Sequence, residues 1–461
     1  MKHKFTTALL SSRWSGLAII FLTYIYLITL SGQAKSVFLW ISNATIILIS
    51  CLLIYFDPAK SVSIVKVVGI FFLLFFGISP ILEYKTGTLY WGGGEMSEYD
   101  YIYSNILIIF SLLLYLFVYS FTLQIKKHES VSPGGLNLFR LSFRNARLRR
   151  LFFVAFVFLL VVFGFNDFNV FNLITRGGDL GVATVVEVKA AGLIVNNFIR
   201  PFCFSALIFA VFFVRNFHFA NRFWLYLLIP IAVFACFPVA LPRFAVAALY
   251  IPLALVLFPG ALRSKFMPAN IFVLSFVSIF PLLDSFRYVD SDFSIDLIRF
   301  NFDFFIAGHF DAYQNFTRTV SLGIVTYGQQ LIGAILFWFP RAFWEGKPIG
   351  SGELLAAAAD LGLSNISQSL PAEGYINFGI FGIFLFIGLS AYGSAVMDAK
   401  FWYREMRSGK TLFSLYYFQL IGLTVFIFRG DLVNAVAYTS GFLSSMFLVC
   451  YVFKLRILSV R

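Results

Sequence analysis

A dense polar tract stands between His309 and Gly382 of a chain that is otherwise strongly apolar. It contains the carboxylates Asp311 and Glu373, a residue type that can take up a proton from a reacting hydroxyl. It also contains Arg341 and Lys347, whose positive charges suit an anionic phosphate. The chemistry we expect here is therefore proton transfer beside a bound phosphate.

Three side chains of this tract are candidates for the proton acceptor. Glu373 directly precedes a predicted membrane span and would border any cavity there. Asp311 begins a helical stripe, where capping the helix is the alternative role. His309 is the one histidine of four that we assign to the outer face, although a lone histidine is usually structural. We name Glu373, Asp311 and His309 as candidate catalytic residues.

A predicted helix start supplies a possible phosphate site. Gly350, Ser351 and Gly352 open a helix in which Ser351 is the expected cap, and free backbone amides at such a start attract anions. Arg341 and Lys347 precede it. An ordinary capped turn is the alternative, because the order of a Walker motif is absent.

Arginines on the expected outer face are a second phosphate signal. Eight arginines but only four lysines map to this face, and the planar guanidinium fits phosphate better than an ammonium does. Snorkelling of single side chains to the interface is the alternative. The candidate diphosphate ligands are Arg341, Lys347, Arg243 and Arg429, with Arg176, Arg200 and Arg287 as further members.

The elements that position these residues must be membrane helices. The chain is 60% hydrophobic and 12% charged over 461 residues, which excludes an ordinary soluble globule. Apolar runs recur throughout the chain, and their lengths are close to the roughly 20 residues that a helix needs to cross a bilayer. They lack the alternation of apolar and polar residues that is typical of a barrel strand. We expect an all-α polytopic integral membrane protein with about twelve spans, near residues 14–31, 37–56, 67–82, 101–123, 151–165, 198–214, 224–240, 244–258, 268–283, 375–393, 411–428 and 432–453.

Charge sets the expected orientation. Seven segments assigned to the cytoplasm hold 23 of the 35 Lys and Arg residues but only 4 of the 22 Asp and Glu residues. Because cytoplasmic loops retain positive charge, both termini are expected inside. The net charge of +13 then reflects topology and anionic membrane lipid.

Long outer segments are expected within one transmembrane domain that spans residues 1–461. They are the loop 166–197 and the large, locally helical loop 284–374, which precedes the tenth span. In the large loop, Tyr313, Phe316 and Val320 form a stripe at helical spacing, and the apolar run 331–339 is too short to span. A Gly-rich segment at 83–100 is expected to be a solvated turn.

The positions of the basic residues and the cysteines argue against nucleic-acid binding, disulfides and a metal site. The basic stretch 140–150 abuts a span and contains no recognition module, so nucleic acid is not an expected partner. The four cysteines all fall within predicted spans, without metal-ligand spacing or a disulfide framework. We therefore expect no metal site.

Short motifs follow one another between about 300 and 385. They are Phe310-Asp311-Ala312-Tyr313-Gln314-Asn315, Tyr327-Gly328, Pro340-Arg341, Trp344, Lys347-Pro348, Gly350-Ser351-Gly352, Asn365-Ile366-Ser367 and Ala372-Glu373-Gly374-Tyr375-Ile376-Asn377-Phe378-Gly379. In this order they resemble the Wzy-type oligosaccharide repeat-unit polymerases of O-antigen and capsule assembly. Arg429-Gly430 also resembles a late arginine of that family.

The resemblance implies a metal-independent, cofactor-free glycosyltransferase of GT-C-like architecture in the bacterial inner membrane, with a periplasmic active site. Its substrates would be undecaprenyl-diphosphate-linked repeat units, and the growing glycan would be transferred onto the incoming unit. A chain-length regulator is a possible partner by the same resemblance.

Two other functions share part of the pattern. An O-antigen ligase that transfers glycan to lipid A core has a similar topology and lipid donor, but it lacks this order of motifs. A polysaccharide flippase or other transporter also has about a dozen spans, but it would usually place polar groups near the middle of the membrane and show two related halves. Here the charges gather at one boundary instead.

Overall fold

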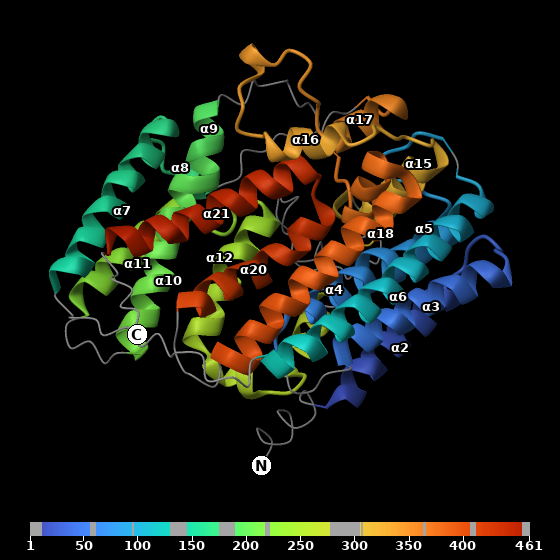
Figure 1. Ribbon diagram of the computed structural model, residues 1–461, viewed down its shortest axis with the longest axis horizontal. Coiled ribbons are helices and arrows are strands. Elements are labelled where there is room, and N and C mark those ends of the chain that lie inside the picture. The colour runs from blue at the N-terminus through green and yellow to red at the C-terminus, as the bar shows by residue number, and fades with distance from the viewer. Residues whose placement is uncertain are drawn as a thin grey trace, which may run out of the picture. The chain divides into compact units, whose positions relative to one another are not determined.

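The computed structural model describes residues 12–55, 61–94, 96–129, 145–174, 190–216, 222–276, 305, 308–362, 366–405 and 412–453. Every regular element in these ranges is a helix, and no strand occurs among them. The all-α prediction is confirmed for this part of the chain. Figure 1 shows the helices in order from the N-terminus in blue to the C-terminus in red.

The helices match the predicted spans closely. Eight are long and apolar enough to cross a membrane, at Val37–Tyr55, Ile64–Thr86, Glu98–Lys127, Arg147–Phe165, Gly192–Asn216, Leu370–Tyr403, Leu412–Arg429 and Leu432–Val452. Three shorter apolar helices, Arg13–Thr29, Phe223–Ala235 and Arg243–Leu257, coincide with three more of the twelve predictions. The remaining predicted span, 268–283, is described only up to residue 276. Helix α13 (Met267–Leu274) covers its first part. These lengths and compositions indicate a multi-pass membrane protein.

Contacts divide the chain into two compact units. The first comprises Met1–Gln124, Gly260–Asp398 and Val425–Asn434, and the second comprises Ile125–Pro259, Ala399–Thr424 and Ala435–Arg461. Helices α2 (Arg13–Thr29), α3 (Val37–Tyr55), α4 (Ile64–Phe72), α5 (Ser79–Thr86), α13, α15 (Ala312–Ser321), α16 (Gln329–Ile335) and α17 (Ser351–Ala358) belong to the first unit. Helices α7 (Asn145–Phe165), α8 (Phe171–Ile174), α9 (Ala190–Ile194), α10 (Arg200–Asn216), α11 (Phe223–Ala235) and α12 (Arg243–Leu257) belong to the second. The chain passes from one unit to the other within α6 (Glu98–Glu129), the 3-10 turn Pro259–Arg263, α20 (Leu412–Arg429) and α21 (Leu432–Val452), and at the end of α18 (Leu370–Ala399).

The core of the first unit forms around α4, a short π-helical segment (Leu73–Ile78) and α5, which run on as one continuous helical stretch. Phe71 packs on Phe428 with ring centroids 5.7 Å apart. Phe76 lies 5.8 Å from the Tyr313 ring and 6.0 Å from the Phe316 ring. This aromatic packing fixes the positions of α15 and the end of α20 in the same unit.

Helix α15 confirms the predicted stripe. Tyr313, Phe316 and Val320 are all buried, and they lie on one face as a 3.6-residue period requires. The Tyr313 hydroxyl lies 2.6 Å from the Tyr84 hydroxyl and donates to Asn105 Oδ1 at 2.9 Å. The opposite face of the helix is polar although it is also buried, so its side chains need partners within the protein.

Helix α18 contains a sharp kink at Phe378 and Gly379. Gly379 has φ +62° and ψ −148°, a conformation open to essentially only glycine. The Cβ of an alanine at Gly374 would lie 2.5 Å from the carbonyl oxygen of Gly382, so the backbone on either side of the kink is closely packed. The kink separates the short segment that carries Glu373 from the long apolar part of the helix.

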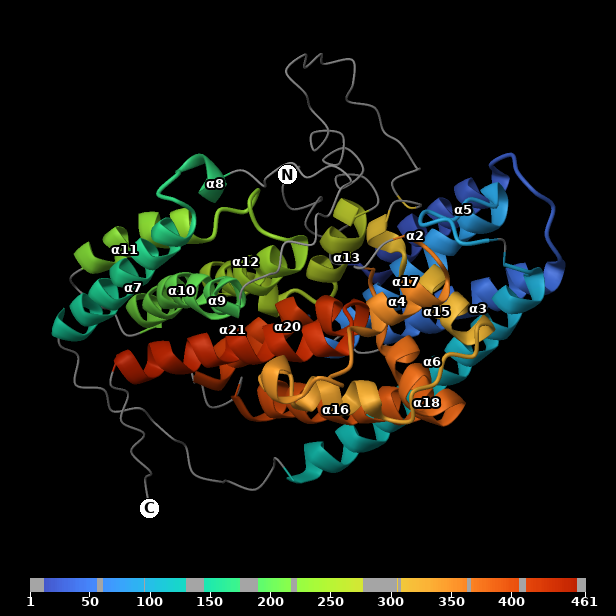
Figure 2. The ribbon, with the colours of Figure 1, turned by 90° about the horizontal axis from the view of Figure 1, so that it is seen from above.

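The second unit is a bundle in which α10 packs against α7, α11 and α12, as Figures 1 and 2 both show for α7, α10 and α11. Gly422 of α20 permits a close approach to α12, because an alanine Cβ there would lie 2.4 Å from the carbonyl oxygen of Ala247. Arg200 begins α10 and Arg243 begins α12. Arg200 and Arg243, two of the predicted phosphate ligands, therefore lie in the second unit.

Candidate functional site

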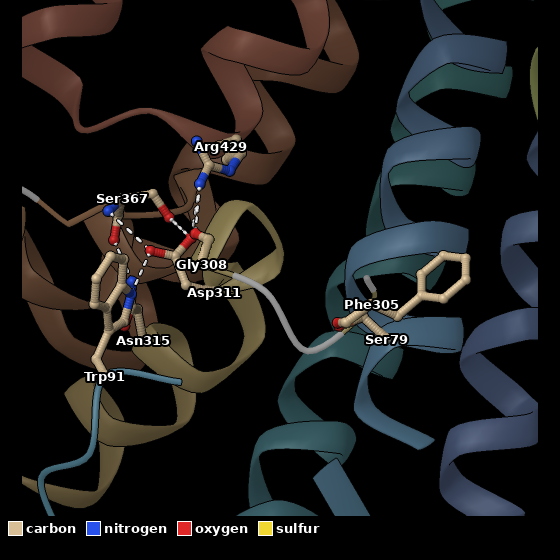
Figure 3. A network of polar contacts seen from close by, with 8 residues as sticks. All are labelled: Ser79, Trp91, Phe305, Gly308, Asp311, Asn315, Ser367 and Arg429. Carbon is tan, nitrogen blue, oxygen red and sulfur yellow. Dashed lines mark hydrogen bonds and ion pairs between the residues drawn. The ribbon is translucent and has the colours of Figure 1, made fainter. Parts of the chain in front are cut away.

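The first unit contains a partly buried ion pair between Asp311 and Arg429, which are 118 residues apart in sequence. Arg429 Nη2 donates to Asp311 Oδ1 at 2.9 Å and to the carbonyl oxygen of Gly308 at 3.1 Å. The Asp311 side chain is 1% exposed and the Arg429 side chain 28% exposed. The arginine therefore keeps part of its surface exposed while it is paired with Asp311 and the carbonyl of Gly308 (Figure 3).

Asp311 accepts hydrogen bonds on both of its oxygens. Besides Arg429, the hydroxyl of Ser367 donates to Oδ1, and the Ser367 amide donates to Oδ2 at 3.3 Å. The indole Nε1 of Trp91 donates to Oδ2 at 2.9 Å. With four donors, this carboxylate is held in one orientation, in which it pairs with Arg429. The expected role of Asp311 as a proton acceptor stays a prediction.

The local backbone explains why Asp311 is available for this role. A 3-10 turn at Gly308–Phe310 precedes α15, and Asp311 occupies the position just before the helix. Its side chain makes no capping hydrogen bond. The alternative capping role considered for Asp311 is thus not the one found, and the ion pair with Arg429 takes its place.

A Gly-rich loop, defined here as residues 87–94, crosses the polar face of α15. The amide of Tyr90 donates to Gln314 Oε1 at 3.2 Å, and Arg318 Nη2 donates to the carbonyl oxygen of Gly92. The glycines at 92, 93 and 94 have φ values of +72°, +82° and +83°, a region that favours glycine. Residues 86–88, 90 and 92–94 are exposed, as expected for a solvated turn. The loop has a further role that was not predicted, because the Trp91 indole donates to Asp311.

A second buried carboxylate, Glu373, lies at the start of α17 and α21. Ser351 Oγ donates to Glu373 Oε2 at 2.9 Å, and the amide of Leu432 donates to Oε1 at 2.9 Å. The neighbouring Asp431 caps α21 by accepting from the Asn434 amide at 2.8 Å. Burial, and secondarily the charge of Glu353, raise the pKa of Asp431 above its usual value. Two carboxylates therefore share this helix start.

The predicted helix at Gly350-Ser351-Gly352 exists, but its details differ from the expectation. Gly350 is the residue before the helix, and Ser351 is its first residue, so Ser351 does not cap the helix. Its side chain is buried against Glu373 instead. Gly350 lies close to Asp431, since an alanine Cβ there would meet Oδ2 at 2.7 Å, and a Cβ on Gly352 would meet the carbonyl oxygen of Ile366 at 2.0 Å. The protein's own carboxylates are thus the anions found beside this helix start.

Arg341 and Lys347 lie in one loop and brace its backbone. Arg341 donates to the carbonyl oxygens of Lys347 at 2.8 Å and Pro348 at 3.2 Å. Lys347 Nζ donates to the carbonyl oxygens of Phe337 at 2.7 Å and Phe339 at 2.8 Å. Desolvation and the nearby Arg341 charge lower the pKa of Lys347. The loop therefore presents two adjacent positive charges.

The remaining predicted residues fall elsewhere. In the second unit, Arg200 Nη2 lies 3.5 Å from Asn166 Oδ1, and Arg243 follows Pro242 at the start of α12. Arg176 and Arg287 lie outside the described residues. His309 is part of the turn before α15, and its side chain lies outside the description. The proposed role of these four cations and the histidine stays a prediction.

Sequence reasoning missed several partners of the site. Trp91, Ser367 and Asp431 were not among the candidates, although each interacts with Asp311 or Glu373. Arg318 of α15, one of the eight arginines expected on the outer face, was not a candidate ligand either, and it donates to the carbonyl oxygen of Gly92. The run of glycines beside Trp91 was the available signal, because three successive glycines permit an unusual backbone close to another element. Within the described residues, no group of three or more His, Cys, Asp or Glu side chains could hold a metal ion.

Comparison with known proteins found no matching protein-family model, no matching curated protein and no matching solved structure. Any inference about the chemistry of the site therefore depends on the geometry of the site itself. The first unit contains the partly exposed guanidinium of Arg429, a loop with the two cations Arg341 and Lys347, and several buried carboxyl groups. Cationic side chains of this kind can bind an anion.

Proposed function

We propose that this chain polymerises undecaprenyl-diphosphate-linked oligosaccharide repeat units at the periplasmic face of a bacterial inner membrane. The growing glycan is transferred to a hydroxyl of the incoming unit, and undecaprenyl diphosphate leaves. The reaction uses no metal and no cofactor. A chain-length regulator is a possible partner.

The observation that carries the proposal is the convergence of motifs that are distant in sequence. Asp311 of the first motif pairs with Arg429, the late arginine. Ser351 of the Gly-Ser-Gly motif bonds Glu373 of the last motif in the large loop. The amide of Gly328 donates to the carbonyl oxygen of Asn377 at 2.9 Å. Motifs that resemble those of one family by their order are thus also joined by contacts.

The cations suit a diphosphate leaving group. Arg341 is exposed, and its two carbonyl bonds use two of the five N–H donors of a guanidinium. Arg429 is oriented by Asp311, which is how a donor can be held ready for charge that develops in a transition state. Removing one such donor typically costs about 10²- to 10³-fold in turnover.

Deletion of the gene tests the proposal in cells. A cell without a polymerase accumulates single lipid-linked repeat units that are exposed on the periplasmic side. Loss of a ligase would leave polymerised glycan on the lipid, and loss of a flippase would leave single units facing the cytoplasm. Accumulation of periplasmic single units is the expected result, and either of the other two patterns would overturn the proposal.

Arg341→Ala is the matching point variant. We expect cells that carry it to accumulate single units, although the protein is present at the wild-type level. Glycan of full length at matched expression would remove Arg341 from the diphosphate site. Analysis of extracted lipid-linked glycans by mass spectrometry reads out both cases.

A further inference from the structure

Buried carboxyl groups of the described residues differ sharply in how well they are hydrogen-bonded. Asp311 and Glu373 accept on both oxygens. Asp398 accepts from the amides of Ile64 and Val65 and from the Tyr119 hydroxyl. Glu83 contrasts with all of them, because it is 1% exposed and neither of its oxygens has a hydrogen-bond partner.

An unpaired buried carboxyl group is costly. Leaving a buried polar group without its hydrogen bond costs about 1–3 kcal/mol, and more where the group is charged. Such groups in native structures usually have a specific reason, such as a catalytic role or a bound water. The position of Glu83 indicates which reason applies.

Glu83 stands beside the polar face of α15. The Gln314 side chain lies toward it without a hydrogen bond of ordinary geometry, and the charges of Asp311 and Arg318 both act on it. Arg318 is 3% exposed, and its Nη1 also has no hydrogen-bond partner. An unmatched acceptor and an unmatched donor therefore stand near the same glutamine.

A hydroxyl group satisfies both requirements at once. It donates through its O–H, which suits Glu83, and it accepts through its oxygen lone pairs, which suits Arg318 Nη1. An ammonium or a phosphate would match only one of the two. The Gly-rich loop at 87–94 lies against the same arginine, because Arg318 Nη2 donates to the carbonyl oxygen of Gly92 and a Cβ on Gly93 would lie 3.0 Å from the Arg318 guanidinium.

We propose that Glu83, with Arg318, binds the acceptor hydroxyl of the incoming repeat unit and that Glu83 takes up its proton. This inference rests on the proposed function. The proton passes from the hydroxyl oxygen to the Glu83 carboxylate as that oxygen forms a bond with the anomeric carbon of the growing glycan. The bond from the anomeric carbon to the diphosphate oxygen breaks, and its electron pair leaves with undecaprenyl diphosphate.

The other two carboxyl groups then have supporting roles. Asp311 accepts four hydrogen bonds and Glu373 accepts one on each oxygen, so both carboxyl groups are held by donors while Glu83 is not. Asp311 orients Arg429, and Glu373 ties the start of α17 to the start of α21. The site separates proton uptake at Glu83 from charge neutralisation at the cations.

The test uses the purified full-length protein with lipid-linked repeat units extracted from the deletion strain. Glu83→Gln preserves the shape of the side chain but cannot take up the proton, so we expect kcat to fall about 100-fold or more. KM should stay within threefold of the wild type, roughly, since binding of the hydroxyl is largely retained. Glu83→Asp should recover part of the lost kcat. Asp360→Asn is the charge-matched control, because Asp360 is exposed and its φ of +49° suits asparagine.

Each outcome decides the question. A Glu83→Gln protein with nearly wild-type kcat would show that Glu83 does not take up the proton. The inference would then fail while the proposed function stood. Equal inactivity of Glu83→Gln and Glu83→Asp, together with a lowered melting temperature for both, would mark a structural role and would also overturn it. If the wild type itself made no polymer, the proposed function and this inference would fail together.

Discussion

At the scale of single residues, the pairing of Asp311 with Arg429 organises the candidate site. Asp311 has its four donors in place, so its charge is held where Arg429 needs it. No local spacing could predict this pair, because 118 residues separate the partners. The sequence did mark both residues as candidates, but for separate roles: Asp311 as a proton acceptor and Arg429 as a diphosphate ligand.

The ion pair can be measured by a double-mutant cycle. Asp311→Asn leaves a partly buried guanidinium without its counter-charge, and Arg429→Gln leaves the carboxylate short of its charged donor. Each single change is expected to lower the free energy of unfolding by about 1–3 kcal/mol. The double variant should lose less than the sum of the two, because contacting residues couple by about 0.5–3 kcal/mol.

Thermal unfolding in detergent reads out this cycle. Strict additivity would show that the pair makes no energetic contact. The Trp91 indole offers an internal check, because its fluorescence should change in Asp311→Asn, where its acceptor is altered.

The raised pKa of Asp431 predicts the direction in which stability changes with pH. Burial raises its pKa, so the folded state holds the proton more tightly than the unfolded state. The contribution of this group to stability is therefore fully present below its unfolded pKa of about 3.9, and it is lost as the pH rises through the folded value. Asp431→Asn keeps an oxygen for the Asn434 amide and removes the charge.

We expect Asp431→Asn to gain melting temperature relative to the wild type as the pH rises from about 4 to neutral. Asp431→Ala loses the cap and should be less stable than Asp431→Asn by about 1 kcal/mol. A constant difference between the wild type and Asp431→Asn across this pH range would show that the carboxyl group does not titrate as described.

At the scale of elements, two backbone features place the site. The Gly-rich loop at 87–94 brings Trp91 onto Asp311, and the kink of α18 separates Glu373 from the long apolar helix. Periodicity predicted α15 and the limited length of α16, because both depend on local spacing. It could not predict the loop's contacts with α15 or the kink, because these depend on packing between distant segments.

Two neighbouring glycines separate backbone strain from packing in the loop. Gly93 has φ +82°, and a Cβ there would lie 2.3 Å from Leu361 and 3.0 Å from the Arg318 guanidinium. Gly94 has φ +83° with nothing within 4 Å. Both Gly→Ala changes should cost roughly 1–3 kcal/mol for the strained backbone.

Only Gly93→Ala also crowds Arg318, so it should lose more melting temperature and more polymer-forming activity than Gly94→Ala. Comparison of the two variants at equal expression measures the difference. Equal losses in both would mean that the packing of the loop against Arg318 does not matter to the site.

The kink at Gly379 gives a similar comparison within α18. Gly379→Ala forces an alanine into a conformation that is open to essentially only glycine, at a cost of about 1–3 kcal/mol. Gly393→Ala, later in the same helix and with nothing within 4 Å, should be neutral or stabilising by up to about 1 kcal/mol. Melting temperatures check this order, and a tolerated Gly379→Ala would show that the kink is not required.

At the scale of the whole molecule, composition predicted most of what the structure shows. Apolar runs located eight long helices and three shorter ones, because a span needs a minimum length of apolar sequence, but some helix ends were missed, as at Leu370–Tyr403 where 375–393 was predicted. The division into two units could not be predicted, because it depends on which helices pack together. The orientation across the membrane is a prediction from charge alone.

Cysteine labelling tests that orientation. Gly346 and Gly260 are both exposed with nothing within 4 Å of an added Cβ, and the four native cysteines are buried. We expect Gly346→Cys to react with a membrane-impermeant maleimide in cells whose outer membrane is permeabilised and whose inner membrane is intact. Gly260→Cys should react only after the inner membrane is opened as well. The reverse pattern would place the candidate site in the cytoplasm.

The purified protein offers the most direct measurement of the central claim. Incubated with lipid-linked repeat units alone, without nucleotide or added metal, the wild type should give a ladder of lipid-linked glycans of increasing length, and Arg429→Lys should give little or none. A wild type that leaves the units unchanged, or an Arg429→Lys protein that extends them at the wild-type rate, would contradict the account.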